Sequence, residues 1–390
     1  MKILYFAFVE LDIPNACQAH SLGVLRGFSD NSCKIDAIVP HSKKVHPKLP
    51  GVFFYYLWPW SFSTIGRLWI RVLCGLFLFG LCFIKKYDAI YVRELEANPF
   101  PRWCSKVFRV PLYIEINGIL LQNMVREGKD IIRMRRAERH QAGDFKQATG
   151  LVVPSFSRCK WIIDHYNLNS EKVHMILNGT DIIVRSKRDR SRALAKLKLP
   201  QDGYFLGFLG NIWEYYDLSC ILKAMEICLE DIPNLHMILI GSGPEIGNLL
   251  NQWQERKVIS RLVFVGYVQQ ESLFEVMEGV DVGLMNLTKK GLQDLGPVTT
   301  RFATYAAFKV PVIANDLYIG NYPQEIREGL SLVAPEDPHA LADMIHWLYT
   351  HPRERKEKAD ILHDFVIRKL TWNAVTEDIL EIINRDKRLN

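Results

Sequence analysis

Short runs of aliphatic and β-branched residues recur along the chain, and the stretches between them carry apolar positions at helical spacing. Each run is almost continuously apolar, as expected of parallel strands that helices cover on both faces. The pattern therefore predicts an α/β fold with parallel sheets. The predicted strands are Ile3–Val9, Lys34–Val39, Phe53–Leu57, Ala89–Val92, Leu112–Ile116, Leu151–Val153 and Val173–Leu177, then Phe205–Leu209, His236–Ile240, Leu262–Val265, Val282–Met285, Val310–Ala314 and Leu330–Val333.

This series of strands occurs twice, which predicts two doubly wound, Rossmann-like domains facing each other across a cleft. Between the two series lies a polar, basic stretch, Arg185–Lys198, which we interpret as the linker. The expected domains are residues 1–198 and 199–371, with residues 372–390 forming a helix that crosses back to the first domain. Ligands of such sheets bind at the carboxyl ends of the strands, so the cleft is the expected site.

Composition excludes several classes of protein. With 390 residues, 48% of them hydrophobic and 24% charged, the chain is neither disordered nor of low complexity. Its eight cysteines are scattered and form no CxxC pair or zinc-spaced cluster. We therefore expect no disulfide scaffold, no metal and a reducing, cytoplasmic location.

The net charge of +6 hides an asymmetry. Residues 1–200 hold 31 lysines and arginines against 16 acidic residues, a net charge of +15, whereas the rest holds 18 against 27, a net charge of −9. The basic half suits an anionic partner such as phospholipid headgroups or a phosphorylated acceptor. No nucleic-acid-binding motif accompanies it, so we do not expect nucleic acid as a partner.

A long apolar segment, Leu68–Ile84, spans 17 residues and contains Arg71. It falls short of the roughly 20 residues that cross a bilayer. Two interpretations stay open: a buried crossover helix between strands, or a helix lying in the membrane interface on the inner face of the cell membrane. The headgroup anchors of the second interpretation are Trp58, Trp60, Trp69, Arg67, Lys85 and Lys86.

Two loops of the second domain have the character of phosphate-binding loops. Gly241-Ser242-Gly243 follows a predicted strand, and its glycines allow a ligand to approach the backbone, although a plain turn explains them equally well. Thr299-Thr300-Arg301 is predicted to begin a helix. There the backbone N–H groups, the two hydroxyls and the guanidinium together favour an anion. The alternative is a threonine cap beside a solvated arginine.

The first domain offers weaker signals. Turns at Asn117-Gly118 and at Asn178–Asp181 end two predicted strands. His20 opens the first helix without a visible catalytic partner. A basic helical stretch that includes Arg136 and Arg139 is either a solvated face or a contact for an anionic acceptor or lipid.

The order of these loops resembles the large retaining GT-B glycosyltransferase family that includes glycogen synthase, sucrose synthase and bacterial envelope transferases. The likeness is strongest after Asn178. The segments that carry it are Asn178–Asp181, His236–Pro244, Leu262–Val268, Val282–Met285, Val310–Asp316, Val333–Leu341 and Leu370–Trp372. The sequence departs from the family at charged positions: Asn117 stands in place of a histidine, Asn211 in place of an arginine, and Gly296 and Thr304 in place of two glutamates.

The resemblance implies an enzyme that transfers a hexose from a nucleotide-diphosphate sugar to an envelope polysaccharide, lipid-linked or related acceptor, with retention and without a metal. It implies three groups of site residues. Catalytic positions are Asn117, Asp294 and Arg301; donor-binding positions are Gly210, Asn211, Gly241, Ser242, Gly243, Tyr267, Val268, Thr299, Thr300, Arg301 and Thr304; acceptor-binding positions are His20, Asn117, Arg136 and Arg139. The missing charges leave an alternative, a non-catalytic GT-B module that binds a partner enzyme or a sugar nucleotide.

Overall fold

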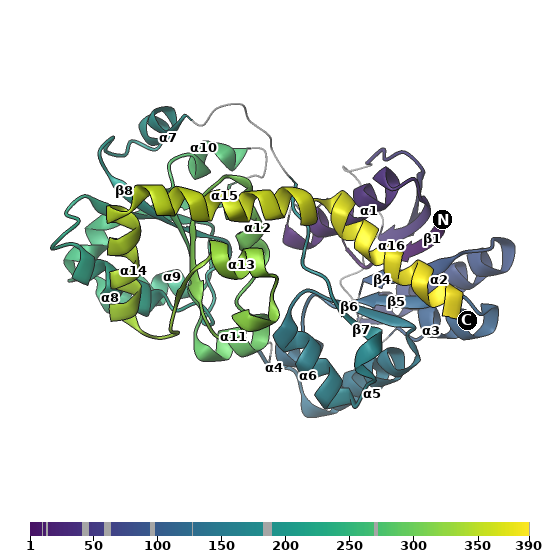
Figure 1. The fold of residues 1–390 in the computed structure, drawn as a ribbon. Coiled ribbons are helices and arrows are strands. Elements are labelled where there is room, and N and C mark those ends of the chain that lie inside the picture. The colour runs from purple at the N-terminus through teal and green to yellow at the C-terminus, as the bar shows by residue number, and fades with distance from the viewer. Residues whose placement is uncertain are drawn as a thin grey trace. The chain divides into compact units, whose positions relative to one another are not determined.

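The computed structural model describes residues 1–9, 11–12, 15–40, 47–57, 64–93, 98–126, 128–181, 189–268 and 272–389. The chain divides into two compact units (Figure 1). The first unit comprises Met1–Gly179 and Thr371–Asn390, and the second comprises Thr180–Leu370.

The first unit is built on a seven-stranded parallel sheet with the order β3-β2-β1-β4-β5-β6-β7. Its strands are β1 (Lys2–Phe6), β2 (Lys34–Pro40), β3 (Val52–Leu57), β4 (Ala89–Arg93), β5 (Leu112–Glu115), β6 (Gly150–Val153) and β7 (Val173–Met175). Its helices are α1 (Ala16–Asp30), α2 (Thr64–Ile84), α3 (Phe100–Phe108), α4 (Leu120–Arg126), α5 (Ile131–Gln147), α6 (Phe156–Tyr166) and α16 (Trp372–Leu389).

The second unit repeats this plan with six parallel strands in the order β10-β9-β8-β11-β12-β13. These are β8 (Tyr204–Leu209), β9 (Leu235–Ile240), β10 (Leu262–Gly266), β11 (Val282–Met285), β12 (Val312–Asn315) and β13 (Ser331–Val333). The helices are α7 (Arg190–Lys196), α8 (Leu218–Cys228), α9 (Glu245–Trp253), α10 (Phe274–Met277), α11 (Lys289–Leu295), α12 (Thr300–Ala307), α13 (Gln324–Gly329), α14 (Pro338–Thr350) and α15 (Pro352–Lys369). The predicted fold class is confirmed, because both sheets are parallel. Their central strands are buried as the continuous apolar runs require, whereas the edge strands β3, β7 and β10 are only partly buried.

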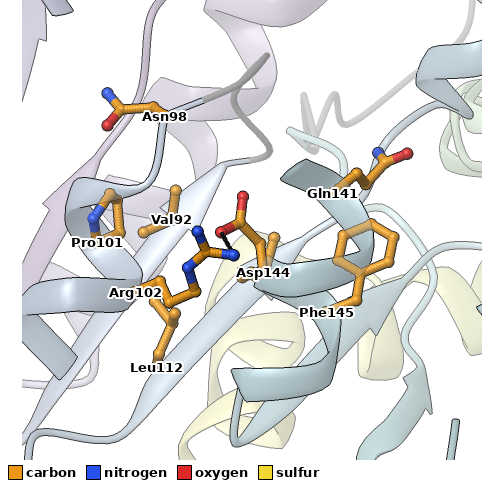
Figure 2. A pocket seen from close by; sticks show the side chains of 9 residues that line it. Val92, Asn98, Pro101, Arg102, Leu112, Gln141, Asp144 and Phe145 are labelled. Carbon is orange, nitrogen blue, oxygen red and sulfur yellow. Dashed lines mark ion pairs between the residues drawn. The ribbon is translucent and has the colours of Figure 1, made fainter. Parts of the chain in front are cut away.

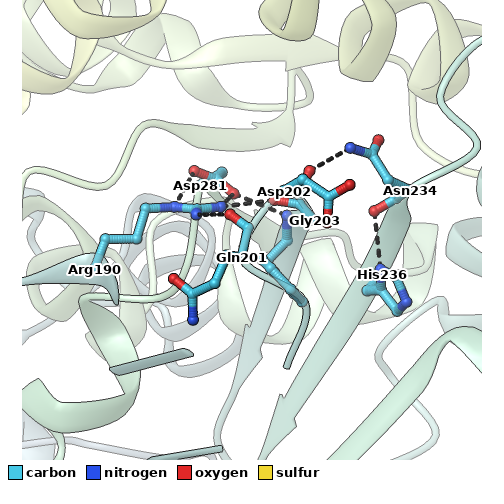
Figure 3. Close-up of polar contacts among 8 residues, drawn as sticks. Arg190, Gln201, Asp202, Gly203, Asn234, His236 and Asp281 are labelled. Carbon is cyan, nitrogen blue, oxygen red and sulfur yellow. Dashed lines mark hydrogen bonds and ion pairs between the residues drawn. The ribbon is translucent and has the colours of Figure 1, made fainter. Parts of the chain in front are cut away.

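The boundary between the units lies earlier than the predicted one at residue 198. Part of the predicted linker, residues 182–188, lies outside the described residues, but α7 belongs to the second unit. Arg190 fixes this helix by gripping Asp281 in a fork, with Nε and Nη2 at 3.3 and 2.8 Å from its two carboxylate oxygens. Arg190 also donates to the carbonyls of Gln201 and Gly203 (Figure 3). Arg190, which the sequence analysis assigns to a linker, is thus part of the second unit. It lies where the strands β8 and β11 begin.

Helix α16 packs along α1 in the first unit (Figure 1). The buried indole of Trp372 fills a socket of glycines: a Cβ atom on Gly23 would lie 2.1 Å from the ring, and one on Gly179 would lie 2.5 Å from it. The start of α16 is therefore held by close packing of the indole, because only glycine leaves room for the ring at these two positions.

Helix α2 combines features of both interpretations of the apolar segment. As the crossover from β3 to β4, it buries Cys74, Leu78 and Leu81 against the sheet. Its outer face leaves large apolar side chains exposed, among them Leu76 and Phe83. The described residues include no helix whose length and apolar character suit a bilayer crossing. The proposed anchors Trp58 and Trp60 lie outside the described residues, as do the side chains of Arg67 and Trp69.

Candidate functional site

The loops at the carboxyl ends of β8 and β9 are pressed against one another. A Cβ atom on Gly241 would lie 2.2 Å from the carbonyl oxygen of Gly210, and one on Gly243 would lie 2.0 Å from that of Ile212. Gly241 and Gly210 also have positive φ angles, 131° and 115°. These glycines therefore allow the two loops to approach each other, a role that turn signals alone do not distinguish from approach to a ligand.

Arg301 lies beside these loops and is buried. Its guanidinium carbon lies 4.5 Å from the ring centre of Phe208 and 3.9 Å from that of Tyr216, so two aromatic rings hold the cation. Nη1 is buried and has no hydrogen-bond partner among the described residues. The solvated alternative is thus wrong, because the guanidinium is buried and held between two rings.

The N-terminus of α12 adds further donors at the same place. Thr299 is the N-cap residue, but its hydroxyl makes no capping hydrogen bond, and Oγ1 is buried without a partner in the described chain. Of the first N–H groups of the helix, that of Phe302 donates to the carbonyl of Thr299 at 3.0 Å. Beside Arg301, this end of α12 carries a positive partial charge that favours an anion.

The other residues predicted to bind the donor or to act in catalysis differ in how exposed they are. Asn211, Ser242 and Thr300 are exposed, and Tyr267 is 62% exposed. Val268 and Thr304 are half-buried, whereas Asp294 is buried in α11. The two rings that hold Arg301, Phe208 and Tyr216, escape sequence reasoning because they lie more than 80 positions from it.

In the first unit, Glu115 joins two predicted residues that are far apart in the sequence. Its Oε1 contacts His20 Nε2 and accepts a hydrogen bond from the amide of Asn117, and its Oε2 accepts from the Tyr91 hydroxyl at 2.9 Å. Glu115 is 3% exposed and ends β5, where it lies in register with Arg93 of β4. Sequence analysis named His20 and Asn117 but missed the carboxylate that links them.

Burial alone would raise the pKa of Glu115, but His20, Arg93 and the Asn117 amide outweigh it and lower the pKa to about 2. The side chain is therefore an anion at neutral pH. Arg136 and Arg139, also predicted on the acceptor side, lie exposed on α5. No contact among the described residues links them to Glu115, His20 or Asn117, so the structure does not bring this predicted set together.

A small cavity of about 20 Å³ lies elsewhere in the first unit, between α3, α5 and the sheet (Figure 2). Arg102 and Asp144 point toward each other there, with Nη1 3.4 Å from Oδ1. Burial raises the pKa of Asp144 to about 7, against the opposing effect of Arg102. The cavity is large enough for about one water and is part of the core.

Asp144 makes the stability of the first unit depend on pH. Because its pKa is higher in the folded chain, its contribution to stability falls as pH rises from the unfolded value near 3.8 to about 7. We expect the free energy of unfolding of Asp144→Asn, relative to wild type, to grow by about 2–4 kcal/mol between pH 4 and 8. Denaturant titrations at both pH values measure this, with the exposed Asp164→Asn as control. A difference independent of pH would contradict the prediction.

Among the described residues, no group of three or more His, Cys, Asp or Glu side chains is placed to hold a metal ion.

The second unit matches a known family. The model described as "Glycosyl transferases group 1" matches residues 203–351, which contain Arg301 and both glycine loops. A D-inositol 3-phosphate glycosyltransferase from Thermobifida fusca is 23% identical over 60% of this chain and 54% of that protein. The putative glycosyltransferase EpsF of Bacillus subtilis is 23% identical over 48% of this chain and 46% of its own length. The chain spans about half the length of these curated relatives.

Solved structures match the whole fold. HepE of Anabaena, crystallised in complex with UDP, aligns with a TM-score of 0.72 at 16% identity over 99% of this chain and 100% of its own. WaaG, a glycosyltransferase of lipopolysaccharide biosynthesis, aligns with a TM-score of 0.66 at 12% identity over 97% and 99% of the two chains. The family match thus covers residues 203–351 of the second unit, and the solved structures show that the chain has the GT-B fold.

Proposed function

We propose that this protein transfers a hexose from a UDP-sugar to an envelope glycan or lipid-linked acceptor at the cytoplasmic face of the membrane. The observation that carries the proposal is Arg301: a buried cation at the N-terminus of α12, held between two rings, whose Nη1 has no partner among the described residues. The choice of UDP is supported by HepE, whose structures contain UDP or UDP-glucose.

The proposed role of this edge is to stabilise the diphosphate as it leaves. Negative charge on the diphosphate grows when its bond to the sugar breaks, so a cation and N–H donors that are already oriented lower the barrier. Arg301 binds phosphate oxygens through its fork, while Thr299 and the first N–H groups of α12 complete the cradle. Gly210, Gly241 and Gly243 let the two loops beside Arg301 pack closely, and we assign the diphosphate to these loops and the base to Tyr267 and Val268. Retention at the anomeric carbon follows from the family resemblance.

A thermal-shift panel tests the donor assignment. UDP, GDP, ADP, CMP and their common sugars are compared, with each ligand raised toward 100 times its dissociation constant. At that concentration a bound ligand adds about 2.7 kcal/mol of stability. We expect UDP and UDP-glucose to raise the melting temperature and the other nucleotides to leave it unchanged. No shift with any nucleotide would contradict the proposal.

A second candidate function is supported by three positions at which the family usually has a charged residue and this chain has a neutral one: Asn211, Gly296 and Thr304. In this function the GT-B module binds a sugar nucleotide or a partner enzyme without transferring a sugar. Release of UDP from UDP-glucose in the presence of acceptors separates the two: binding without turnover supports the second candidate.

The membrane part of the proposal is supported by the outer faces of α2 and α3. These helices pack together, with the rings of Phe79 and Phe108 4.7 Å apart, and expose apolar side chains to solvent. We call this set the α2–α3 face; it comprises Leu73, Leu76, Phe79, Phe83, Trp103 and Val107. Exposed Lys86, Lys106 and Arg109 accompany it. An apolar face with basic neighbours suits the headgroup region of an anionic bilayer.

Vesicle sedimentation tests this face. Leu76→Asp/Phe83→Asp removes two exposed apolar side chains and adds negative charge, so we expect at least tenfold weaker partition onto vesicles containing phosphatidylglycerol. Ile227→Asp, at an exposed position on α8 of the second unit, is the matched control and should partition like wild type. Equal partition of all three proteins would exclude the α2–α3 face as the membrane contact.

A further inference from the structure

A groove of about 770 Å³ runs along the outer edge of the first unit's sheet, between β7 and α16. Strand β7 ends the strand order, and no described strand pairs with its outer side. Ile176 donates its N–H to Val153 of β6, so the N–H and C=O of Met175 point the other way, toward the open edge. Such an edge is a template for pairing with another strand.

Helix α16 forms the other wall of the groove and runs antiparallel to β7. Its first residue, Trp372, packs against Gly179 beyond the end of β7. Near the other end of α16 lies Arg385, which together with burial lowers the pKa of His174 within β7. The side chains of α16 that line the groove are therefore acidic toward the end of β7 and basic toward its start: Asp378, Glu381, Ile382, Asn384, Arg385 and Arg388.

The order of these charges is self-complementary. Glu381 and Arg388 are exposed and lie seven residues apart, about 10 Å along one face of α16. A two-fold axis perpendicular to the sheet pairs β7 with the β7 of a second copy in antiparallel orientation. The two α16 helices then run antiparallel as well, so Glu381 of each copy lies level with Arg388 of the other.

We infer that two copies of this chain dimerise by pairing their β7 strands into one continuous sheet, with the charged ends of the two α16 helices in contact across the two-fold axis. Half-buried Ile382 lies between those ends and supplies an apolar contact at the centre. The inference goes beyond the proposed function and does not depend on it.

This pairing leaves the α2–α3 face uncovered. Side chains alternate along a strand, and Leu112 and Ile114 of β5 share a core with α2 and α3, whereas Tyr113 points the other way and donates to Asp386 of α16. Helix α16 and the α2–α3 face therefore lie on opposite sides of the sheet. The two-fold axis puts both copies of the α2–α3 face on the same side of the dimer, which is compatible with the proposed membrane contact.

Analytical ultracentrifugation of the full chain tests the inference. Wild type should form a dimer whose population rises with protein concentration. Glu381→Arg places two cations at each contact and Arg388→Glu places two anions there, so each variant alone should dimerise at least tenfold more weakly. Arg353→Glu, at an exposed position on α15 of the second unit, is the matched control and should dimerise like wild type.

Recombining the two variants makes the result specific. An equimolar mixture of the Glu381→Arg and Arg388→Glu proteins has opposite charges at both contacts, so it should form heterodimers with near wild-type affinity. The double variant should form homodimers for the same reason. Met175→Pro removes only an N–H that faces the open edge, so it should weaken the dimer and leave the melting temperature of the monomer unchanged.

A wild-type protein that stays monomeric would overturn the inference and leave the groove to a strand of another protein. A dimer that neither charge reversal weakens, or a mixture of the two variants that stays monomeric, would overturn it as well. The same holds for a Met175→Pro protein that melts and dimerises like wild type. If Met175→Pro fails to fold, the charge variants decide, because Glu381 and Arg388 are exposed on the surface of α16.

Discussion

Arg301→Ala is expected to reduce turnover of the donor by 10²- to 10³-fold and to abolish the thermal shift with UDP. The reason is the position of the guanidinium: it is buried between Phe208 and Tyr216, and its Nη1 has no protein partner in the described chain. Removing one oriented donor from a site that stabilises developing charge costs about 3–4 kcal/mol of barrier. Steady-state release of UDP and the thermal-shift panel measure the two effects.

Two further variants make this result specific. Arg301→Lys keeps the positive charge but loses the planar fork, so it should recover only part of the activity. Arg327→Ala, at an exposed position of the same unit, should behave like wild type. An Arg301→Ala protein that melts normally and retains turnover within threefold of wild type would remove Arg301 from the donor site.

Trp372→Ala is expected to destabilise the first unit by about 3–5 kcal/mol, the usual cost of removing a buried indole. The ring fills the space above Gly23 and Gly179 and touches the edge of His20, so its loss leaves a cavity between α16 and α1. Chemical denaturation of the first unit measures the loss. Trp103→Ala, whose ring is half exposed on α3, should cost less than about 1 kcal/mol.

A double-mutant cycle identifies the socket as the cause. In wild type, Gly23→Ala places a methyl group 2.1 Å from the indole and should be strongly destabilising. In the Trp372→Ala background the clash is absent, and alanine is the better helix former, so the same change should be neutral or stabilising. Additive costs would show that α16 is held by other contacts.

The fold class of this protein and the places of its strands can be predicted from the sequence. All thirteen predicted strands are present, because a parallel strand buried on both faces must be apolar along its length, and that run is visible locally. The sequence also predicted Thr299 and Arg301 at the start of a helix, since a turn after a strand is a local signal as well.

The tertiary structure decided how the site residues are held. Spacing does not show that Arg301 lies between Phe208 and Tyr216, or that Glu115 binds His20 from 95 positions away. The role of the glycine loops and the place of α7 in the second unit were decided in the same way. These features depend on contacts between distant elements, and such contacts are set by how the elements pack and not by the residues next to them in the chain.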